Sequence, residues 1–85
     1  MADPAGDLLR VVRHLVDHPE AVRVDEGRRG RMRVLEVVVA PEDMGSVIGR
    51  NGRTAQALRT LLRARGDRMG ESYDLRIREQ EGRQP

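Results

Sequence analysis

A short turn with glycine at both ends, Gly49-Arg50-Asn51-Gly52, constrains the fold of this chain more than any other stretch. The apolar pair Val47-Ile48 precedes the turn, and an amphipathic run that starts at Arg53 follows it. Glycine adopts positive φ readily and lets two backbones approach closely. We therefore expect a sharp corner between two helices. The alternative is a corner in which glycine only ends a helix, but the arginine between two glycines favours a binding turn.

The same corner is suited to hold a phosphate group. A helix that starts at Gly52 directs its free N–H groups and the positive end of its dipole outward. Arg50 on the turn and Arg53 in the first helical turn add positive charge there. Residues 44–66 carry five arginines and no acid, whereas residues 1–27 carry three arginines and six acids. The positive potential is therefore concentrated around the turn.

The first half of the chain predicts a helix and a β-hairpin. The helix is expected over 7–17, with Asp7 as its cap. Its apolar face is expected to contain Leu8, Leu9, Val11, Val12, Leu15 and Val16. The hairpin is expected to have strands over 22–25 and 31–40 and a turn over 26–30. The core face of its second strand is expected to contain Leu35, Val37 and Val39.

The second half predicts two helices and a strand. A short helix is expected before Gly49, with Pro41 in its first turn, and we interpret Glu42 and Asp43 as acids that complement its dipole. Its apolar face is expected to contain Met44, Val47 and Ile48. A second helix is expected over 53–65 and is ended by Gly66, with a loop over 67–72 and a strand over 73–78. Its core face is expected to contain Ala57, Leu58, Leu61 and Leu62. Its outward face is expected to contain Arg53, Gln56, Arg59 and Arg63.

These elements give the order α-β-β-α-α-β in one domain of the α+β class. Two helices separate the second strand from the third, which favours parallel pairing of those strands. We expect a three-stranded mixed sheet covered on one face by three helices. The domain is expected over 7–78, with flexible ends over 1–6 and 79–85.

Several chemistries are excluded by residues that the chain lacks. It has no cysteine for thiol chemistry and no lysine for a Walker phosphate loop, so we expect neither an enzyme nor a cofactor. His14 and His18 are four residues apart, but no glutamate follows His14 and no third ligand is evident. We interpret both as solvent-facing and expect no metal. A single aromatic residue, Tyr73, predicts an aliphatic core and excludes the stacking platforms of RRM-type and OB-type binders.

Nothing in the sequence indicates a membrane or an export signal. No apolar run approaches the ~20 residues of a membrane span. The start Met1-Ala2-Asp3-Pro4 is not a signal peptide. We therefore expect a cytoplasmic protein.

The stretch Val47-Ile48-Gly49-Arg50-Asn51-Gly52 resembles the signature of KH domains, a V-I-G-x-x-G turn followed by an amphipathic helix. The wider run over 41–61 is similar to the KhpA family of small bacterial single-KH-domain proteins, and the resemblance covers about residues 7 to 78. It implies the type II KH fold, whose element order agrees with the order predicted above. One departure is Ala55, where many KH domains have isoleucine, which predicts a shallower groove floor.

The resemblance implies binding of single-stranded RNA, with four nucleotides in a groove and the glycine turn on their backbone. The residues expected to contact RNA are Val47, Ile48, Gly49, Arg50, Asn51, Gly52, Arg53, Gln56 and Arg59. Leu58, Leu75 and Ile77 are candidates for the floor, although we interpret them as core. Single-stranded DNA is an alternative ligand. The hairpin arginines at 28, 29, 31 and 33 either assist RNA binding or form a solvated tip.

The resemblance also implies partners. It implies an RNA chaperone or post-transcriptional regulator that forms a homodimer, or a heterodimer with a KhpB-type protein (also called Jag or EloR), linked to cell elongation and division. The alternative function is an interaction module that dimerises or docks such a partner. We expect pairing because a single KH groove binds weakly and two linked grooves gain avidity. The short helix near Met44 and Gly45 is one candidate interface.

Overall fold

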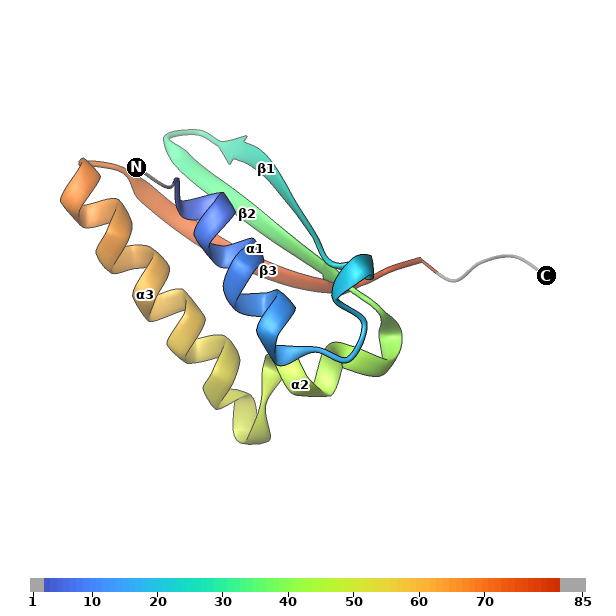
Figure 1. Ribbon diagram of the computed structural model, residues 1–85. Coiled ribbons are helices and arrows are strands. Elements are labelled where there is room, and N and C mark those ends of the chain that lie inside the picture. The colour runs from blue at the N-terminus through green and yellow to red at the C-terminus, as the bar shows by residue number, and fades with distance from the viewer. Residues whose placement is uncertain (1–2, 82–85) are drawn as a thin grey trace.

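The computed structural model describes residues 3–81 and has the order α-β-β-α-α-β, as predicted (Figure 1). The helices and strands are α1 (Pro4–Leu15), β1 (Arg23–Arg29), β2 (Met32–Val39), α2 (Met44–Ile48), α3 (Arg53–Met69) and β3 (Ser72–Glu79). Short 3-10 turns cover Pro19–Ala21, Pro41–Asp43 and Arg50–Gly52. None of the helices in this part of the chain is long and apolar enough to cross a membrane.

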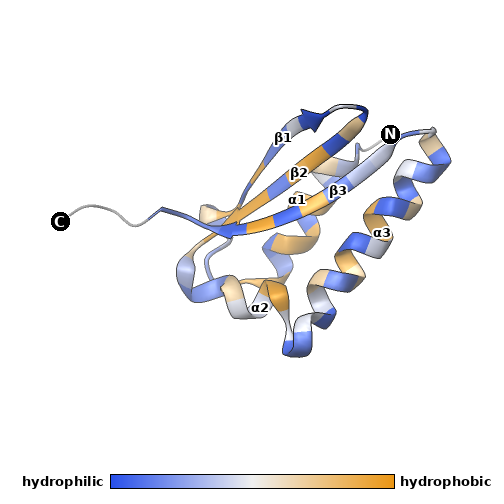
Figure 2. Ribbon diagram, turned by 180° about the vertical axis from the view of Figure 1, so that it is seen from behind, coloured by the Kyte–Doolittle hydropathy of each residue, from blue (hydrophilic) through white to orange (hydrophobic). Residues whose placement is uncertain are grey.

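The three strands form one mixed sheet in the order β1-β2-β3. β1 pairs antiparallel with β2, and β2 pairs parallel with β3. The helices lie on one face of this sheet and leave the other face open (Figures 1 and 2). The predicted α+β class, with a three-stranded mixed sheet and three helices, is therefore confirmed.

The core lies between the central strand and the helices. The predicted core face of β2 is confirmed, because the side chains of Leu35, Val37 and Val39 are fully buried. The alternation is not complete, since Val38 on the other face is only 1% exposed. Around them are Leu8, Val12, Val47, Leu58, Leu62, Tyr73 and Leu75. Tyr73 is only 5% exposed, so the prediction of a purely aliphatic core is wrong by this one residue. Its hydroxyl accepts a hydrogen bond from Nη1 of Arg33 at 3.1 Å, which satisfies the buried polar end of the ring.

Helix α1 begins earlier than predicted. Asp3 is the cap, because its Oδ1 accepts a hydrogen bond from the N–H of Gly6 at 2.6 Å. Asp7 lies inside the helix and pairs with Arg65 of α3. Two residues predicted on the apolar face are partly exposed, Val11 at 43% and Leu15 at 39%, because the six apolar positions span more of the helix than the core can cover.

The ends of the chain were expected to be flexible over 1–6 and 79–85. Residues 1–2 and 82–85 lie outside the described part of the chain. Pro4 to Gly6 form the first turn of α1, and the N–H of Gln80 donates to the carbonyl oxygen of Val39 at 2.7 Å.

The hairpin turn is tighter than predicted. β1 extends to Arg29, which pairs with Met32, so the turn contains only Gly30 and Arg31. Gly30 has a φ of 62°, which a two-residue hairpin turn requires. Gly27, predicted in the turn, lies inside β1 opposite Val34.

Helix α3 does not end at Gly66, and the predicted loop over 67–72 is mostly helix and strand. The helix continues to Met69 and ends at Gly70, which has a φ of 73°. Gly66 is buried, and a Cβ there would lie 2.6 Å from the carbonyl oxygen of Glu71 and 2.7 Å from Cδ1 of Tyr73. Gly66 therefore permits close packing of α3 on β3 instead of ending the helix.

The core face of α3 is also corrected at two positions. Leu58 and Leu62 are buried as predicted, but Ala57 is exposed and Leu61 is 62% exposed. Ala55 is buried in their place. The helix is rotated so that Leu61 lies toward α1 on the surface.

Candidate nucleic-acid interface

The glycine turn forms the corner between α2 and α3, as predicted. Gly49 has a φ of 79° and Gly52 a φ of 71°. Asn51 also lies in the left-handed region, with a φ of 57°, which asparagine tolerates better than most residues. The corner is closed by the N–H of Gly49 on the carbonyl of Gly45 at 2.8 Å and by the N–H of Gly52 on the carbonyl of Gly49 at 3.1 Å. Three of the four turn residues thus depend on backbone conformations that few residue types adopt.

The two glycines are required for different reasons. A Cβ on Gly49 would lie 2.3 Å from Oγ1 of Thr54 and 2.8 Å from its backbone nitrogen, so a side chain cannot fit. A Cβ on Gly52 would have nothing within 4 Å, and only its positive φ selects glycine. The outer side of Gly52 is therefore open to an incoming group.

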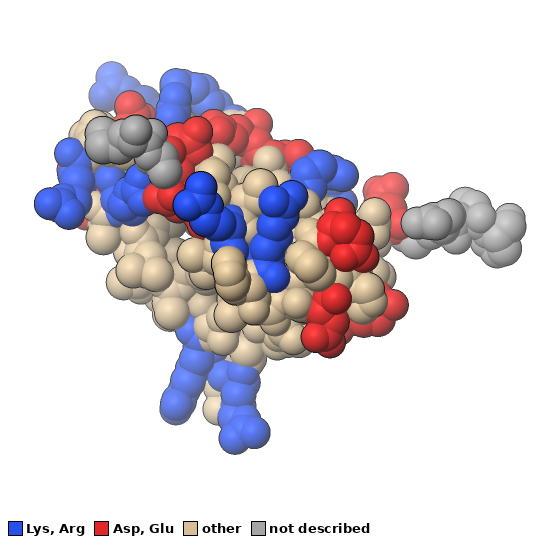
Figure 3. All heavy atoms as spheres, in the orientation of Figure 1, with Lys and Arg blue, Asp and Glu red and all other residues tan. Residues whose placement is uncertain are grey.

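Positive charge projects from this corner. Arg50, Asn51 and Arg53 are all exposed. In the described part of the chain none of these side chains has a hydrogen bond or an ion pair with another residue, nor do those of Arg59 and Arg63. Arginine side chains extend into solvent where α2 meets α3 (Figure 3). Their charges are available to a ligand.

One flank of α3 continues this surface. Gln56, Arg59 and Arg63 recur at spacings of three and four, so they share one side of the helix. The opposite flank contains Leu61 and Arg65 and faces α1. The first three residues therefore lie on the side away from α1, above the free edge of β3, which contacts both α2 and α3. The corner, this flank and the edge of β3 border one surface.

The apolar residues beside the turn divide into surface and core. Ile48 is 38% exposed and lies next to Gly49 on the surface, as a floor residue should. Val47 is fully buried, which corrects its assignment as a direct contact: its side chain holds α2 on the core. Leu58 and Leu75 are buried in the core, and Ile77 is half-buried against it, which agrees with their interpretation as core residues.

Sequence reasoning missed the role of Asp43. Its carboxylate is 1% exposed and accepts hydrogen bonds from the N–H groups of Asp17 at 3.1 Å and His18 at 3.0 Å, and it also contacts Nδ1 of His18 at 3.1 Å. Asp43 therefore ties the end of α1 to the start of α2, in addition to standing at a helix start. No local pattern signals this role, because its partners lie 25 and 26 residues earlier.

The environment shifts the pKa values of both Asp43 and His18. Burial raises the pKa of Asp43, but the hydrogen bonds from Asp17 and His18 lower it by more, so the pKa lies below the usual range. The hydrogen bond to Asp43 raises the pKa of His18, and slight desolvation opposes the effect. His14 faces solvent, with Nδ1 2.8 Å from the carbonyl oxygen of Arg10. Residues 3–81 contain no group of three or more His, Cys, Asp or Glu that could hold a metal ion.

The element order and the glycine corner between two helices define a type II KH domain. The family model "KhpA/KhpB, KH domain" matches residues 7–77, and the chain belongs to this family.

Relatives of known name agree with this assignment. RNA-binding protein KhpA of Leifsonia xyli is 58% identical over 63 residues, which cover 74% of this chain and 83% of that protein. RNA-binding protein KhpA of Streptomyces coelicolor is 54% identical over 68 residues, which cover 80% and 85% of the two chains. A crystal structure of Aquifex aeolicus Era bound to GDP and AlF4⁻ superposes with a TM-score of 0.60 at 14% identity, covering 89% of this chain and 29% of Era. The likeness to Era concerns the fold alone.

Proposed function

We propose that this protein binds single-stranded RNA at the glycine corner, as a chaperone or post-transcriptional regulator and not as an enzyme. The observation that carries the proposal is the corner itself: an open backbone turn flanked by Arg50 and Arg53, neither of which is paired within residues 3–81. Its relatives in Leifsonia and Streptomyces are named RNA-binding proteins.

Each predicted residue has a part in this binding. The backbone of Gly49 to Gly52 approaches the RNA phosphates where no Cβ blocks Gly52. Arg50 and Arg53 neutralise phosphate charge, while Asn51 supplies a side-chain amide for hydrogen bonds. Gln56 and Arg59 extend the contact along α3. Ile48 lies under the bases, and Val47 supports it from the core.

The test is a double substitution at the tip of the corner. Arg50→Asp with Asn51→Asp keeps both glycines and changes the net charge by −3. Arg10→Asp with Arg13→Gln makes the same change on exposed positions of α1 and is the matched control. Titration of a short single-stranded RNA, with circular dichroism of each protein, should show loss of binding only for the corner variant. Equal affinity of corner variant and wild type, with the fold intact, would refute the proposal.

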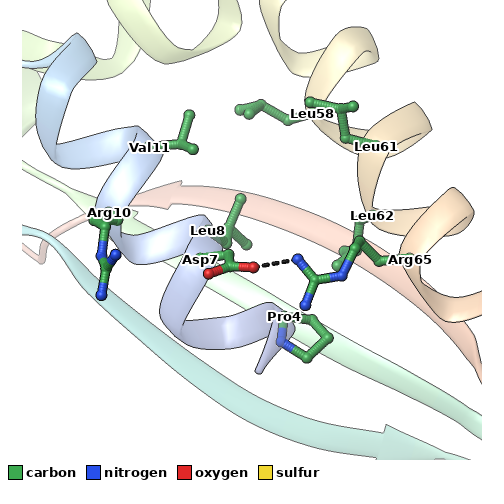
Figure 4. A pocket seen from close by; sticks show the side chains of 9 residues that line it. All are labelled: Pro4, Asp7, Leu8, Arg10, Val11, Leu58, Leu61, Leu62 and Arg65. Atoms are coloured by element: carbon green, nitrogen blue, oxygen red, sulfur yellow. Dashed lines mark hydrogen bonds and ion pairs between the residues drawn. The ribbon is translucent and has the colours of Figure 1, made fainter. Parts of the chain in front are cut away.

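A second proposed property is self-association through α1 and α3. Exposed aliphatic side chains gather on these helices: Leu61 is 62% exposed and Val11 43%. They border a groove of about 350 Å³, in which Val11 lies across from Leu58 and Leu61 (Figure 4). A largely uncharged surface covers this part of the molecule (Figure 3). A second copy of the chain would cover it, and this favours α1 and α3 over the region of Met44 and Gly45 as the interface.

Self-association would place two corners in one particle. A single corner offers few phosphate contacts, so two linked corners gain affinity when one RNA reaches both. A KhpB-type partner that covers the same groove is the alternative, and in that case the protein alone would be monomeric. Mass measurement of the protein with and without such a partner separates the two.

A further inference from the structure

The hairpin tip carries a second group of unpaired arginines. The tip consists of Arg28, Arg29, Gly30 and Arg31, all exposed. Within residues 3–81, none of these three arginine side chains forms an ion pair or a hydrogen bond with another residue. Other arginines of the sheet are neutralised in pairs: Arg23 with Asp25, Arg33 with Glu71, and Arg78 with Glu36. Arg76 of β3 is the other sheet arginine without an ion pair in residues 3–81, so the unpaired positive charge of the sheet lies at the end of the hairpin and at Arg76.

The strand register places like charges opposite each other at this end. Arg28 pairs with Arg33 across the two strands. Directly opposed like charges destabilise a sheet. Glu71 and Glu26 act on Arg33 and raise its pKa, after the larger effect of its hydrogen bond to Tyr73. Arg28 has no ion pair within residues 3–81, and a local cost of this kind is typical of a binding surface.

A hollow lies beside the tip on the sheet face that the helices leave open. Its volume is about 300 Å³. Gly27 and its cross-strand partner Val34 form part of its lining, and a Cβ on Gly27 would meet nothing within 4 Å. Glycine inside a strand often marks the close approach of a ligand. The hollow is therefore open above the backbone of Gly27, beside Val34.

The charges around the hollow suit an anionic ligand. Arg29 and Arg76 contribute cations on this face, and Arg28, which pairs with Arg33 on the opposite face, adds its charge at the end of the hairpin. Among its acids, Asp25 and Glu36 are already held by Arg23 and Arg78, which leaves Glu26 as the acid without an ion pair inside residues 3–81. Arg31 of the turn adds one more positive charge beyond the rim.

The tip and the glycine corner lie at opposite ends of the molecule. Helix α3 starts at the corner and runs 17 residues, or about 25 Å. It ends next to β3, whose first residue Ser72 pairs with Met32 beside the tip. Arginines project at the top and at the bottom of the view in Figure 3, and mostly uncharged side chains lie between them. Two separate segments of one ligand, or two strands, can occupy these ends together.

We propose that the hairpin tip and its hollow bind a second segment of single-stranded RNA. Arg28, Arg29 and Arg31 contact its phosphates, and one base lies over Gly27 and Val34. This inference rests on the proposed function, because it takes the same ligand class at a second place. It gives a small protein a means to hold two RNA segments about one helix length apart.

The experiment is an NMR titration of isotope-labelled full-length protein with a mixture of single-stranded RNA tetranucleotides. The tip variant is Arg29→Gln with Arg31→Gln, and the matched control is Arg10→Gln with Arg13→Gln. A second variant, Gly27→Val, fills the hollow, and it should fold well because valine suits a strand and the space is open. We expect two groups of shifted amides in the wild type: one at 49–53 and one at 27–34.

Each of the two variants at the hairpin should remove one of the two groups of shifted amides. The tip variant and Gly27→Val should lose the shifts at 27–34 and keep those at the corner, while the α1 control keeps both. For a 12-nucleotide RNA, the tip variant should make the negative slope of log affinity against log salt shallower by about 1.4, from ~0.7 for each of two lost contacts.

The outcomes separate the two proposals. Shifts at the corner alone would overturn the second site and leave the proposed function standing. Shifts at 27–34 alone would support the second site and overturn the corner. No shift at either place would overturn both.

Discussion

The Nδ1 atom of His18 lies 3.1 Å from Oδ2 of Asp43, and this contact joins the chain after α1 to the residue just before α2. Asp43 is buried, and the exposed imidazole of His18 covers it from the solvent side. Since α2 carries the glycine corner at its end, the contact helps to fix the position of the candidate RNA site relative to α1. It also makes that position sensitive to pH.

The first prediction concerns His18 and the loss of its stabilising effect as pH rises. The pKa of His18 is raised in the folded state, so its stabilising effect is fully present below about pH 6.5, the unfolded value, and is lost as pH rises through the folded pKa. The difference in thermal unfolding between the wild type and His18→Gln should be largest near pH 6 and should decrease as pH rises toward 8. His14→Gln, at an exposed histidine, is the control. A difference that stays constant from pH 6 to pH 8 would contradict this assignment.

The second prediction concerns Asp43 and the loss of its stabilising effect as pH falls. The pKa of Asp43 is lowered, so its contribution is present above the unfolded value of about 3.9 and is lost as pH falls through the folded pKa. Asp43→Asn should destabilise the protein at pH 6, because an amide presents N–H groups to the N–H donors of Asp17 and His18. The difference between the two proteins should shrink as pH falls below the unfolded value. Glu42→Gln, at an exposed position, should show little change at either pH.

A third prediction concerns the packing of α3 on β3. Gly66→Ala places a Cβ 2.6 Å from the carbonyl oxygen of Glu71, so helix and strand must separate. We expect a loss of about 1–3 kcal/mol in the free energy of unfolding, measured in urea. Gly45→Ala is the control, since a Cβ there meets nothing within 4 Å and alanine favours the helix by roughly 0.5–1 kcal/mol. An unchanged stability of Gly66→Ala would show that the contact relaxes freely.

Local patterns predicted the parts of the fold that depend on local physics. The alternation of Leu35, Val37 and Val39 identified the core face of β2, and the glycine spacing identified the corner, because both signals lie within a few residues. Gly66 was misread because its constraint comes from Glu71 and Tyr73, across a turn that the sequence did not locate. Asp43 was misread for the same reason, since its hydrogen-bond donors come from the end of α1.

In the candidate site, too, the sequence predicted the features that depend on neighbouring residues and not those that depend on distant contacts. The conformations of Gly49 and Gly52 followed from their spacing, but the depth of each apolar neighbour did not. Val47 and Ile48 look alike in sequence, yet one is fully buried and the other is 38% exposed. Which of two adjacent apolar residues faces a ligand depends on how α2 is rotated, and packing against β3 and α3 sets that rotation.

The last prediction tests self-association at the groove between α1 and α3. Leu61→Arg puts a charge at the most exposed aliphatic residue of that surface without touching the core, so the fold should remain. If a second copy covers the groove, the charge would be buried without a partner, and the dimer should weaken at least about tenfold, or ~1.4 kcal/mol.

Thr60→Arg is the control, because it adds the same charge to an exposed position of α3 that does not line the groove. Sedimentation at micromolar concentration should give a dimer for the wild type and the control and a monomer for Leu61→Arg. The Leu61→Arg variant should keep its affinity for a four-nucleotide RNA and lose the part of the preference for RNA of twelve or more nucleotides that comes from paired corners. A wild type that sediments as a monomer would refute self-association. A Leu61→Arg protein that stays dimeric would show that the interface lies on another surface.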